Sequence, residues 1–471
     1  MRVLLLNLPG RVRLMRRYVA SYYAPNFLIP PLELMGLGAI AGQRSGCQVR
    51  LLDCVAAGLD LVPAVRRAQR FRPDVVVSLL GFEVCGEDLD ALAVFRRALQ
   101  PSTVLAFGYL AGELPEQVLA HDACDGVLLG EPELTFGEVL DHLERGADLD
   151  GIPGLARQVE GRMERGPERG RTQDLDALPW PDHSLLDQGA YRESFMPRPI
   201  GAIMTARGCP HRCTFCVRTY GRELVLRSAA SVADEVASLG RRGIRHVRFM
   251  DDTFTVRRDR TLEICDRLGR EKGLTWTALT RLGGLDDEQL AAMHRAGCQR
   301  LYVGIESGSQ RILDQYRKNL TVEAIRDAVP RIQAAGIEVS AFFIVGAPGE
   351  TESDVEASLQ LALELEPEYV IVTRLQYWPG TDLHAEHRER LSFSLVPTHC
   401  EPLPAAGIPS YADFLRWERM FYRRFYLRPS YMRRRAATLA RSPADIAEGL
   451  ARLGSWVATS GSAADGGRDF I

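Results

Sequence analysis

Short apolar runs alternate with helical spacing over the first 147 residues of the chain. Runs of this length, bounded by turn residues, are typical of buried parallel strands. The strand candidates are residues 2–7, 49–53, 74–80, 104–107 and 126–129, and the helix candidates between them are residues 32–44, 61–71, 89–99, 114–119 and 136–143. The alternation predicts a doubly wound, Rossmann-like parallel sheet over residues 1–147, with ligands bound beyond the carboxyl ends of its strands.

The pattern is interrupted at residues 148–198 and then resumes. The interruption is polar, rich in Gly and Pro and poorly periodic, which predicts a linker with room for a small hairpin. Beyond it, βα-type units are repeated six times, with strand candidates at residues 200–205, 246–250, 275–280, 300–305, 339–345 and 369–373. Six such units predict a partial parallel barrel of the TIM type over residues 199–380.

The last part of the chain is less regular. Residues 381–458 are predicted to form a small, mostly helical region, and residues 459–471, rich in Ser, Gly and Asp, are predicted to be disordered. Residues 416–441 combine many arginines with aromatic side chains. We interpret this stretch as a solvated helical face or a lid in which arginine stems pack on aromatics, in preference to an RNA- or lipid-binding surface.

Composition narrows the class of protein. The 471 residues are 46% hydrophobic and 25% charged, with a net charge of −3, which is ordinary for a soluble globular protein and argues against a protein that coats nucleic acid. The first apolar run is too short for a signal peptide, and no run approaches the ~20 residues of a membrane helix. We therefore expect a cytoplasmic protein without a transmembrane segment. Its 10 cysteines are then expected to be buried, metal-binding or catalytic and not paired as disulfides.

Polar and glycine residues follow every strand of the predicted barrel. Because the carboxyl ends of parallel strands share one rim, where barrel enzymes keep their active sites, these residues predict a single large site. In chain order they are a cysteine-rich loop, Asp251 and Asp252, Arg281, Glu306 and Ser307, Gly346 and Pro348, and Tyr377.

The loop after the first barrel strand holds Cys209, Cys213 and Cys216. Three unrelated buried thiols so close together would be prone to oxidation. A structural zinc site needs four closed ligands, but no second pair of ligands is present and His211 is badly placed to complete the set. An iron–sulfur cluster held by three thiolates keeps one iron open for a substrate or cofactor. We therefore favour a cluster bound by these three cysteines.

The spacing Cys-x3-Cys-x2-Cys, with Phe215 just before the last cysteine, resembles that of the radical S-adenosylmethionine (SAM) superfamily. The resemblance covers roughly residues 199–380 and implies a 4Fe-4S cluster whose open iron chelates SAM. Reductive cleavage of SAM then gives methionine and a 5′-deoxyadenosyl radical. The resemblance further implies contacts to SAM at its amino group, near its ribose and near its adenine, made by Asp251 and Asp252, by Glu306 and Ser307, and by Gly346 and Pro348, respectively. Phe215 and Arg281 are further cofactor-contact candidates at this rim.

A Rossmann-like domain ahead of such a barrel resembles the cobalamin-binding subfamily. The residues that support the resemblance are Ser78 and Leu80, Gly108, and Gly130 with Glu131, which lie at the ends of the third, fourth and fifth strands. Methionine synthases ligate cobalt with a histidine after the first strand, but neither residues 7–11 nor residues 53–58 contain one. The resemblance therefore implies cobalamin without a histidine ligand from the protein.

Together these features predict an oxygen-sensitive, cobalamin-dependent radical SAM enzyme. The favoured activity is methylation of an unactivated carbon in a small-molecule, lipid or natural-product intermediate, with electrons from a donor such as flavodoxin or ferredoxin. The alternative within enzymes is a non-methylating member that carries out oxidative cyclisation or rearrangement. An RNA methylthiotransferase would need a second set of three cysteines, which the isolated Cys47, Cys54, Cys85 and Cys124 do not provide. A cobalamin sensor is disfavoured by the intact cysteine triad.

Overall fold

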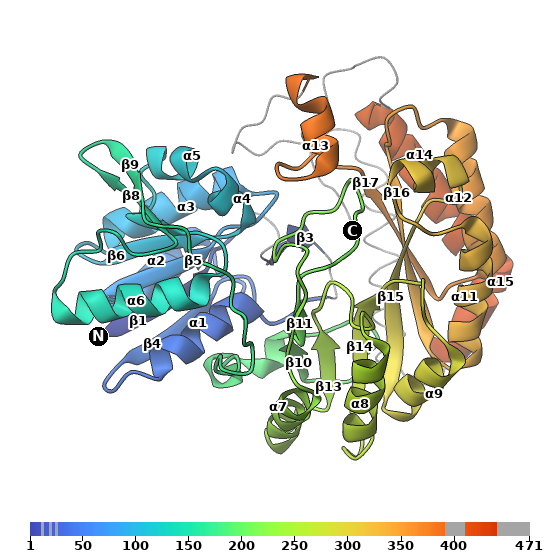
Figure 1. Cartoon of the computed structure of the whole chain (residues 1–471), viewed down its shortest axis with the longest axis horizontal. Coiled ribbons are helices and arrows are strands. Elements are labelled where there is room, and N and C mark those ends of the chain that lie inside the picture. Colours follow the sequence, from blue (N-terminus) through green and yellow to red (C-terminus); the bar gives the residue numbers. More distant parts are fainter. Residues whose placement is uncertain (11–13, 18–20, 24–26, 391–409, 440–471) are drawn as a thin grey trace.

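The computed structural model describes residues 1–10, 14–17, 21–23, 27–390 and 410–439. It contains two α/β bodies side by side, an N-terminal one and a larger C-terminal one, with the segment that joins their sheets, residues 166–199, running between (Figure 1). No helix within these ranges is both long enough and apolar enough to span a membrane.

The N-terminal body is a seven-stranded sheet. Its first five strands are parallel, in the spatial order β4 (Gln48–Asp53), β1 (Arg2–Asn7), β5 (Val75–Leu79), β6 (Thr103–Phe107) and β7 (Gly126–Leu128). Six helices connect and flank the strands: α1 (Leu32–Gly42), α2 (Leu61–Phe71), α3 (Cys85–Ala98), α4 (Tyr109–Glu113), α5 (Pro115–Ala120) and α6 (Pro132–Arg145). Every residue of β5 is buried, as expected for a parallel strand covered on both faces. The predicted doubly wound sheet is confirmed, and its strand order reverses between β1 and β5, where ligands of such sheets bind.

One hairpin of this body agrees with the sequence pattern and another was not predicted. The segment predicted as a linker with room for a small hairpin supplies β8 (Leu155–Val159) and β9 (Arg162–Arg165), a hairpin that also extends the sheet through antiparallel pairing with β7, which was not predicted. A second hairpin, β2 (Leu14–Arg16) with β3 (Ser21–Tyr23), follows β1. The buried Arg16 side chain fixes it, since its guanidinium donates to both carboxylate oxygens of Asp88 at 2.8 and 2.7 Å and to the carbonyl of Leu8 at 2.7 Å.

The C-terminal body is a six-stranded parallel sheet in chain order: β10 (Ile200–Ile203), β13 (His246–Phe249), β14 (Thr275–Thr280), β15 (Cys298–Glu306), β16 (Glu338–Val345) and β17 (Tyr369–Arg374). The connecting helices are α7 (Ala229–Arg241), α8 (Arg258–Leu268), α9 (Asp287–Arg295), α10 (Gln310–Gln315), α11 (Val322–Ala334) and α12 (Glu352–Leu365). Because β10 and β17 are the two ends of this order and are not paired with each other, the barrel is partial, as predicted.

The amino-terminal end of this barrel is closed by the segment that joins the two bodies. Glu193 is fully buried there, and its carboxylate accepts hydrogen bonds from the hydroxyls of Tyr302 at 2.7 Å and Thr277 at 2.9 Å. It also lies 3.4 Å from the guanidinium of Arg248, which stacks over the Tyr302 ring at 3.8 Å. The joining segment therefore fills the end of the barrel opposite to the predicted site.

The C-terminal helices cover the free edge of the barrel sheet. After α13 (Asp382–His387), the described chain resumes with α14 (Tyr411–Tyr426) and α15 (Pro429–Leu439). The hydroxyl oxygens of Tyr422 and Tyr426 accept hydrogen bonds from the backbone N–H groups of Val372 and Val370, each at 3.0 Å. These bonds provide partners for backbone groups on the open edge of β17. The predicted helical region is thus confirmed over residues 410–439, whereas residues 391–409 and 440–458 and the predicted disordered tail lie outside the described residues.

The arginines of α14 and α15 are engaged within the molecule. Arg424 pairs with Glu356 of α12 at 2.5 Å, and Arg416 lies 3.4 Å from Glu352 of the same helix. Arg434 pairs with Glu366, which directly follows that helix, at 3.0 Å. The aromatic face of α14 packs into the barrel core, where the Phe421 and Phe343 ring centroids are 5.1 Å apart. The described part of the Arg-rich stretch is therefore a packed helical face.

Candidate active site at the cysteine loop

The cysteine loop is fixed by a short hairpin at its base. β11 (Ala206–Arg207) pairs antiparallel with β12 (Val225–Leu226), so both ends of the loop are held together. Between them, the backbone N–H of Cys209 donates to the carbonyl of Gly221 at 3.1 Å. Gly208 has φ +89°, and a Cβ there would lie 2.0 Å from the carbonyl oxygen of Glu223, so only glycine fits. The fold thus shapes this loop through its own backbone contacts.

The middle of the loop is pinned to the chain after α10. The N–H of Thr214 donates to the carbonyl of Tyr316 at 3.0 Å, and the carbonyl of Thr214 accepts from the N–H of Leu383 at 2.9 Å. The Phe215 ring meets the buried Tyr316 ring edge to face at 4.9 Å. Phe215 therefore anchors the loop by packing; its contact with a cofactor stays a prediction.

The three thiols lie near one another at the carboxyl end of the barrel. Burial raises the pKa of Cys209 and Cys216, and the nearby Asp252 carboxylate and the thiol of Cys213 act in the same direction. Arg281 lies at this point too, since its guanidinium donates to Sγ of Cys213 at 3.7 Å and to the carbonyl of Asn319 at 3.2 Å. Because these thiols hold their protons tightly, a metal that binds them must displace those protons.

The donor set fits a cluster better than a single ion. In the described ranges of the chain, no three Cys, His, Asp or Glu side chains converge closely enough to hold one metal ion. Zinc would require such convergence. Three thiolates on three different irons of a cluster need not converge on one point, and three closely spaced cysteines on a pre-shaped loop meet that requirement.

The two aspartates after β13 have different surroundings. The carboxylate of Asp251 accepts hydrogen bonds from the N–H groups of Thr205 at 2.5 Å and Ala206 at 3.1 Å, and from the Thr205 hydroxyl at 2.5 Å. It thereby supports the backbone that leads into the cysteine loop. The carboxylate of Asp252 has no hydrogen bond to any described residue. Burial, with a further contribution from Asp251, raises its pKa to about 6. Of the two, Asp252 is the one free to receive a cationic group.

The end of β15 carries a buried ion pair. Glu306 has φ +70°, and the pairing of β15 with β16 shifts register between Gly304 and Glu306. The Nζ of Lys318 lies 2.5 Å from Oε1 of Glu306, and both side chains are buried. Burial lowers the pKa of His211 in the cysteine loop, and the nearby Arg281 and Lys318 act in the same direction. Lys318 was not predicted, because it follows no recognised pattern and reaches the site only through the turn after α10.

The remaining predicted residues of this rim are fixed by their own partners. The Ser307 hydroxyl lies 3.1 Å from that of Ser358 in α12. Gly346 has φ +103° and donates its N–H to Glu350, and the carbonyl of Pro348 accepts from Gln315 at 3.1 Å. Tyr377 is buried and belongs to the same apolar cluster as Tyr316. The structure thus brings these residues to one rim, and their contacts with SAM stay predictions.

The candidate cofactor-binding residues of the N-terminal body do not all lie at the carboxyl edge of the sheet. The Ser78 hydroxyl donates to the carbonyl of Leu6 at 3.1 Å inside the sheet, so it does not face the rim. The N–H of Leu80 donates to the carbonyl of Phe107 at 2.8 Å. Gly108 has φ +140°, and a Cβ there would lie 2.6 Å from the carbonyl oxygen of Leu80. Only a glycine allows this close approach of two strand ends.

The rim of this sheet packs against the rim of the barrel. Phe82, after β5, packs against Trp378, after β17, with 4.0 Å between the ring centroids and 47° between the ring planes. The hydroxyl of Tyr109, after β6, donates to the carbonyl of Pro379 at 2.9 Å. Gly130, after β7, has φ +64°, and the adjacent Glu131 pairs with Arg207 at 2.6 Å. The carboxyl edges of the two sheets are therefore in direct contact.

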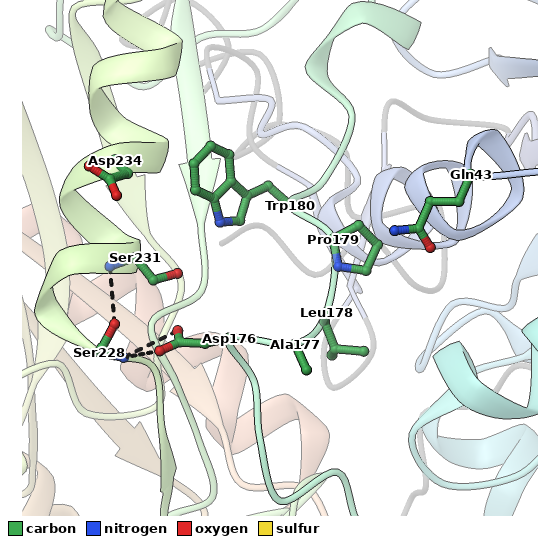
Figure 2. A pocket seen from close by; sticks show the side chains of 9 residues that line it. All are labelled: Gln43, Asp176, Ala177, Leu178, Pro179, Trp180, Ser228, Ser231 and Asp234. Carbon is green, nitrogen blue, oxygen red and sulfur yellow. Dashed lines mark hydrogen bonds between the residues drawn. The ribbon is translucent and has the colours of Figure 1, made fainter.

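A separate hollow lies on the surface between the joining segment and α7, lined by residues that include Asp176, Trp180 and Ser228 (Figure 2). The backbone N–H of Ser228 donates to the carboxylate of Asp176 at 3.0 and 3.2 Å. None of the predicted site residues lines this hollow. The chemistry predicted from the sequence therefore belongs to the cysteine rim and not to this surface.

Comparison with known proteins agrees with this geometry. Residues 203–362 match the radical SAM superfamily. The uncharacterized methyltransferase PH0819 of Pyrococcus horikoshii is 32% identical over 359 residues, which are 75% of this chain and 77% of that protein. Cytidylyl-2-hydroxyethylphosphonate methyltransferase of Streptomyces wedmorensis is 29% identical over 390 residues, 70% of this chain and 73% of the relative.

A solved structure shares both bodies of the fold. The radical SAM methyltransferase TsrM from Kitasatospora setae, with cobalamin and a [4Fe-4S] cluster bound, superposes with a TM-score of 0.66 over 82% of this chain and 74% of that chain, at 21% identity. At that identity the likeness concerns the fold. Together with the three-cysteine loop at the rim of a partial barrel, these matches show that the chain belongs to the radical SAM superfamily of enzymes.

Proposed function

We propose that this protein is a cobalamin-dependent radical SAM methyltransferase that methylates an unactivated carbon of a small-molecule, lipid or natural-product intermediate. The observation that carries the proposal is the contact between the two carboxyl edges, where Phe82 and Tyr109 of the N-terminal sheet meet residues 378–379 beyond β17. Such an arrangement would bring a cofactor bound at one edge close to a cofactor bound at the other. Two relatives named as methyltransferases, each matched over at least 70% of this chain, add support.

The residues of the barrel rim suit a cluster and SAM. Cys209, Cys213 and Cys216 would each ligate one iron and leave the fourth for SAM. Asp252, half-buried and without a hydrogen-bond partner among the described residues, would receive the amino group of SAM, and the Glu306–Lys318 pair would border the same site. When bound, the cluster and SAM supply a 5′-deoxyadenosyl radical, and cobalamin supplies the methyl group. The protein orients these groups and excludes water from them.

The N-terminal rim suits a large planar cofactor. Gly108 holds the ends of β5 and β6 closely together, next to the point where the strand order reverses. No histidine lies in the loop that begins after β1 or in the turn after β4, at residues 7–11 and 53–58, so cobalt would lack a histidine from those loops. An electron donor of the flavodoxin or ferredoxin type would reduce the cluster.

The test uses protein reconstituted anaerobically with iron, sulfide and hydroxocobalamin and freed of unbound cofactor. After addition of SAM and a strong reductant, methylcobalamin and 5′-deoxyadenosine are quantified together. The proposal expects cobalamin bound in about equal amount to the protein and converted to methylcobalamin. Bound cobalamin that is never methylated, with 5′-deoxyadenosine still formed, would replace it with the non-methylating alternative. Absence of bound cobalamin would overturn it.

A further inference from the structure

A buried ion-pair network crosses between the two bodies of the protein. Nη1 of Arg207, in β11, lies 2.6 Å from Oε2 of Glu131, and Nη2 pairs with Glu133. Both carboxylates stand just after β7, on the carboxyl edge of the N-terminal sheet, whereas Arg207 stands two residues before Cys209. Arg207 is buried, and each carboxylate is nearly so. In Figure 1, β11 lies between the two bodies.

The same network also holds the far end of the cysteine loop. Arg171, in the joining segment, donates from Nε to Glu131 at 3.3 Å and from Nη1 to the carbonyl of Glu223 at 2.7 Å. Glu223 follows the third cysteine, as Arg207 precedes the first. Glu131 therefore connects to both ends of the loop, directly through Arg207 and indirectly through Arg171.

The Arg207 guanidinium is held in one orientation. Its carbon lies 4.9 Å from the centre of the buried Tyr220 ring, in the last turn of the cysteine loop. A planar guanidinium that contacts two carboxylates and an aromatic face is restrained far more than a lysine ammonium would be. Domains can be joined at least as firmly by apolar side chains, so stability alone does not account for three buried charges at this interface.

We propose that Arg207 is a positioning residue. Through Glu131 and Glu133 it fixes the cysteine loop relative to the carboxyl edge of the N-terminal sheet, and thereby sets the separation between cluster and cobalamin. The inference rests on the proposed function, and it assigns Glu131 to this link instead of to direct contact with cobalamin. It predicts that loosening Arg207 alters both bodies at once, although each body keeps its own cofactor.

The test compares Arg207→Gln and Arg207→Lys with Arg44→Gln. Arg44 pairs with Asp141 at 2.7 Å inside the N-terminal body, so it controls for loss of a partly buried arginine without crossing the interface. Hydrogen exchange is measured for residues 126–146 and 208–224 in the protein without cofactors. The proposal expects Arg207→Gln to speed exchange about tenfold in both segments, Arg207→Lys to lie between it and wild type, and Arg44→Gln to leave residues 208–224 unchanged.

A second readout reports the separation of the cofactors. In loaded protein, the electron-spin relaxation of cob(II)alamin is measured with the cluster oxidised and then reduced, since the dipolar effect of the reduced cluster falls steeply with distance. The proposal expects a weaker effect in Arg207→Gln at unchanged iron and cobalamin content. Glu133→Gln, which keeps Glu131, serves if Arg207→Gln does not load, and a weaker effect there supports the proposal equally.

Two outcomes would overturn the inference. Faster exchange confined to residues 208–224 would show that Arg207 supports only the cysteine loop. Unchanged exchange in both segments would show that Arg207 positions neither of them. Failure of the proposed function is seen separately, because a wild-type protein without bound cobalamin still gives the exchange result.

Discussion

Two carboxylates at opposite ends of the same barrel, one fully buried and one half-buried, show how differently one scaffold treats a negative charge. Glu193, at the amino-terminal end, has Tyr302 and Thr277 as hydrogen-bond donors and Arg248 as a cationic neighbour. Burial alone would raise its pKa, but Arg248, His246 and Arg300 outweigh burial and lower the pKa to about 2. Asp252, at the carboxyl end, is only partly shielded from water and has no hydrogen bond among the described residues, and its pKa rises to about 6.

The difference separates a charge that stabilises the fold from one that is left for a ligand. A satisfied carboxylate is stabilised by the folded state, so its removal costs stability. An unsatisfied one is destabilised there, and such groups are typical of sites that await a ligand. The amino-terminal end of the barrel is thus a completed structure, whereas the carboxyl end is completed only when its ligands bind.

The largest effect is expected from Cys213→Ala. One ligand of the proposed cluster is lost, so 5′-deoxyadenosine formation from SAM should fall below detection, with iron content reduced. The fold should persist, because the backbone contacts of Cys209 and Thr214 shape the loop without the Cys213 thiol. Cys47→Ala, at a half-buried thiol in the N-terminal body, is the control and should leave cleavage intact. Cleavage that persists in Cys213→Ala would remove the cluster assignment.

Glu193→Gln should break the satisfied end of the barrel. The amide keeps the shape of the carboxylate but leaves the buried Arg248 and Arg300 without their shared negative charge, which costs about 3–5 kcal/mol of unfolding free energy. Urea unfolding followed by tryptophan fluorescence measures the loss. Glu288→Gln, at an exposed pair with Arg258, should change stability by about 0–1 kcal/mol. Equal effects of the two substitutions would show that Glu193 is not a structural charge.

Acid should weaken the same end of the barrel. Because the folded-state pKa of Glu193 lies below its ordinary value, its ionised form contributes stability that is complete above about pH 4.5 and is lost as pH falls toward 2. A shift of that size corresponds to roughly 3 kcal/mol. The stability gap between wild type and Glu193→Gln should therefore be constant from pH 7 to 5 and narrow below that. A gap that stays constant down to pH 3 would contradict the depressed pKa.

The sequence predicted the parts of the protein that are encoded locally. Apolar periodicity within each unit was enough for the doubly wound sheet and the partial barrel, and three cysteines within eight residues were enough for the loop. The role of Glu193 could not be predicted in this way, since its partners Thr277 and Tyr302 lie 84 and 109 residues further along the chain. Lys318 was missed for the same reason, because its importance comes only from its place beside Glu306.

The sequence predicted where a motif residue lies better than it predicted what its side chain contacts. Asp251 stands at the expected strand end, yet its oxygens are occupied by Thr205 and Ala206, which the sequence could not reveal. The arginines of α14 resemble a nucleic-acid-binding run in composition, but Arg416 and Arg424 face acidic residues of α12 that lie 64 and 68 residues earlier. In both cases the deciding partner comes from another element, and only the fold brings the two together.

The smallest effect, and the sharpest contrast with Glu193, is expected from Asp252→Asn. The substitution removes a half-buried charge that has no hydrogen-bond partner among the described residues, so unfolding free energy should stay within about 1 kcal/mol of wild type or rise slightly. If Asp252 receives the amino group of SAM, loss of that charge-assisted hydrogen bond should weaken SAM binding about 10- to 100-fold. Calorimetric titration of SAM into anaerobic, cluster-loaded protein measures the affinity, with Asp266→Asn, on the exposed face of α8, as the control. A large loss of stability with unchanged SAM affinity would make Asp252 a second structural carboxylate and end the contrast between the two ends of the barrel.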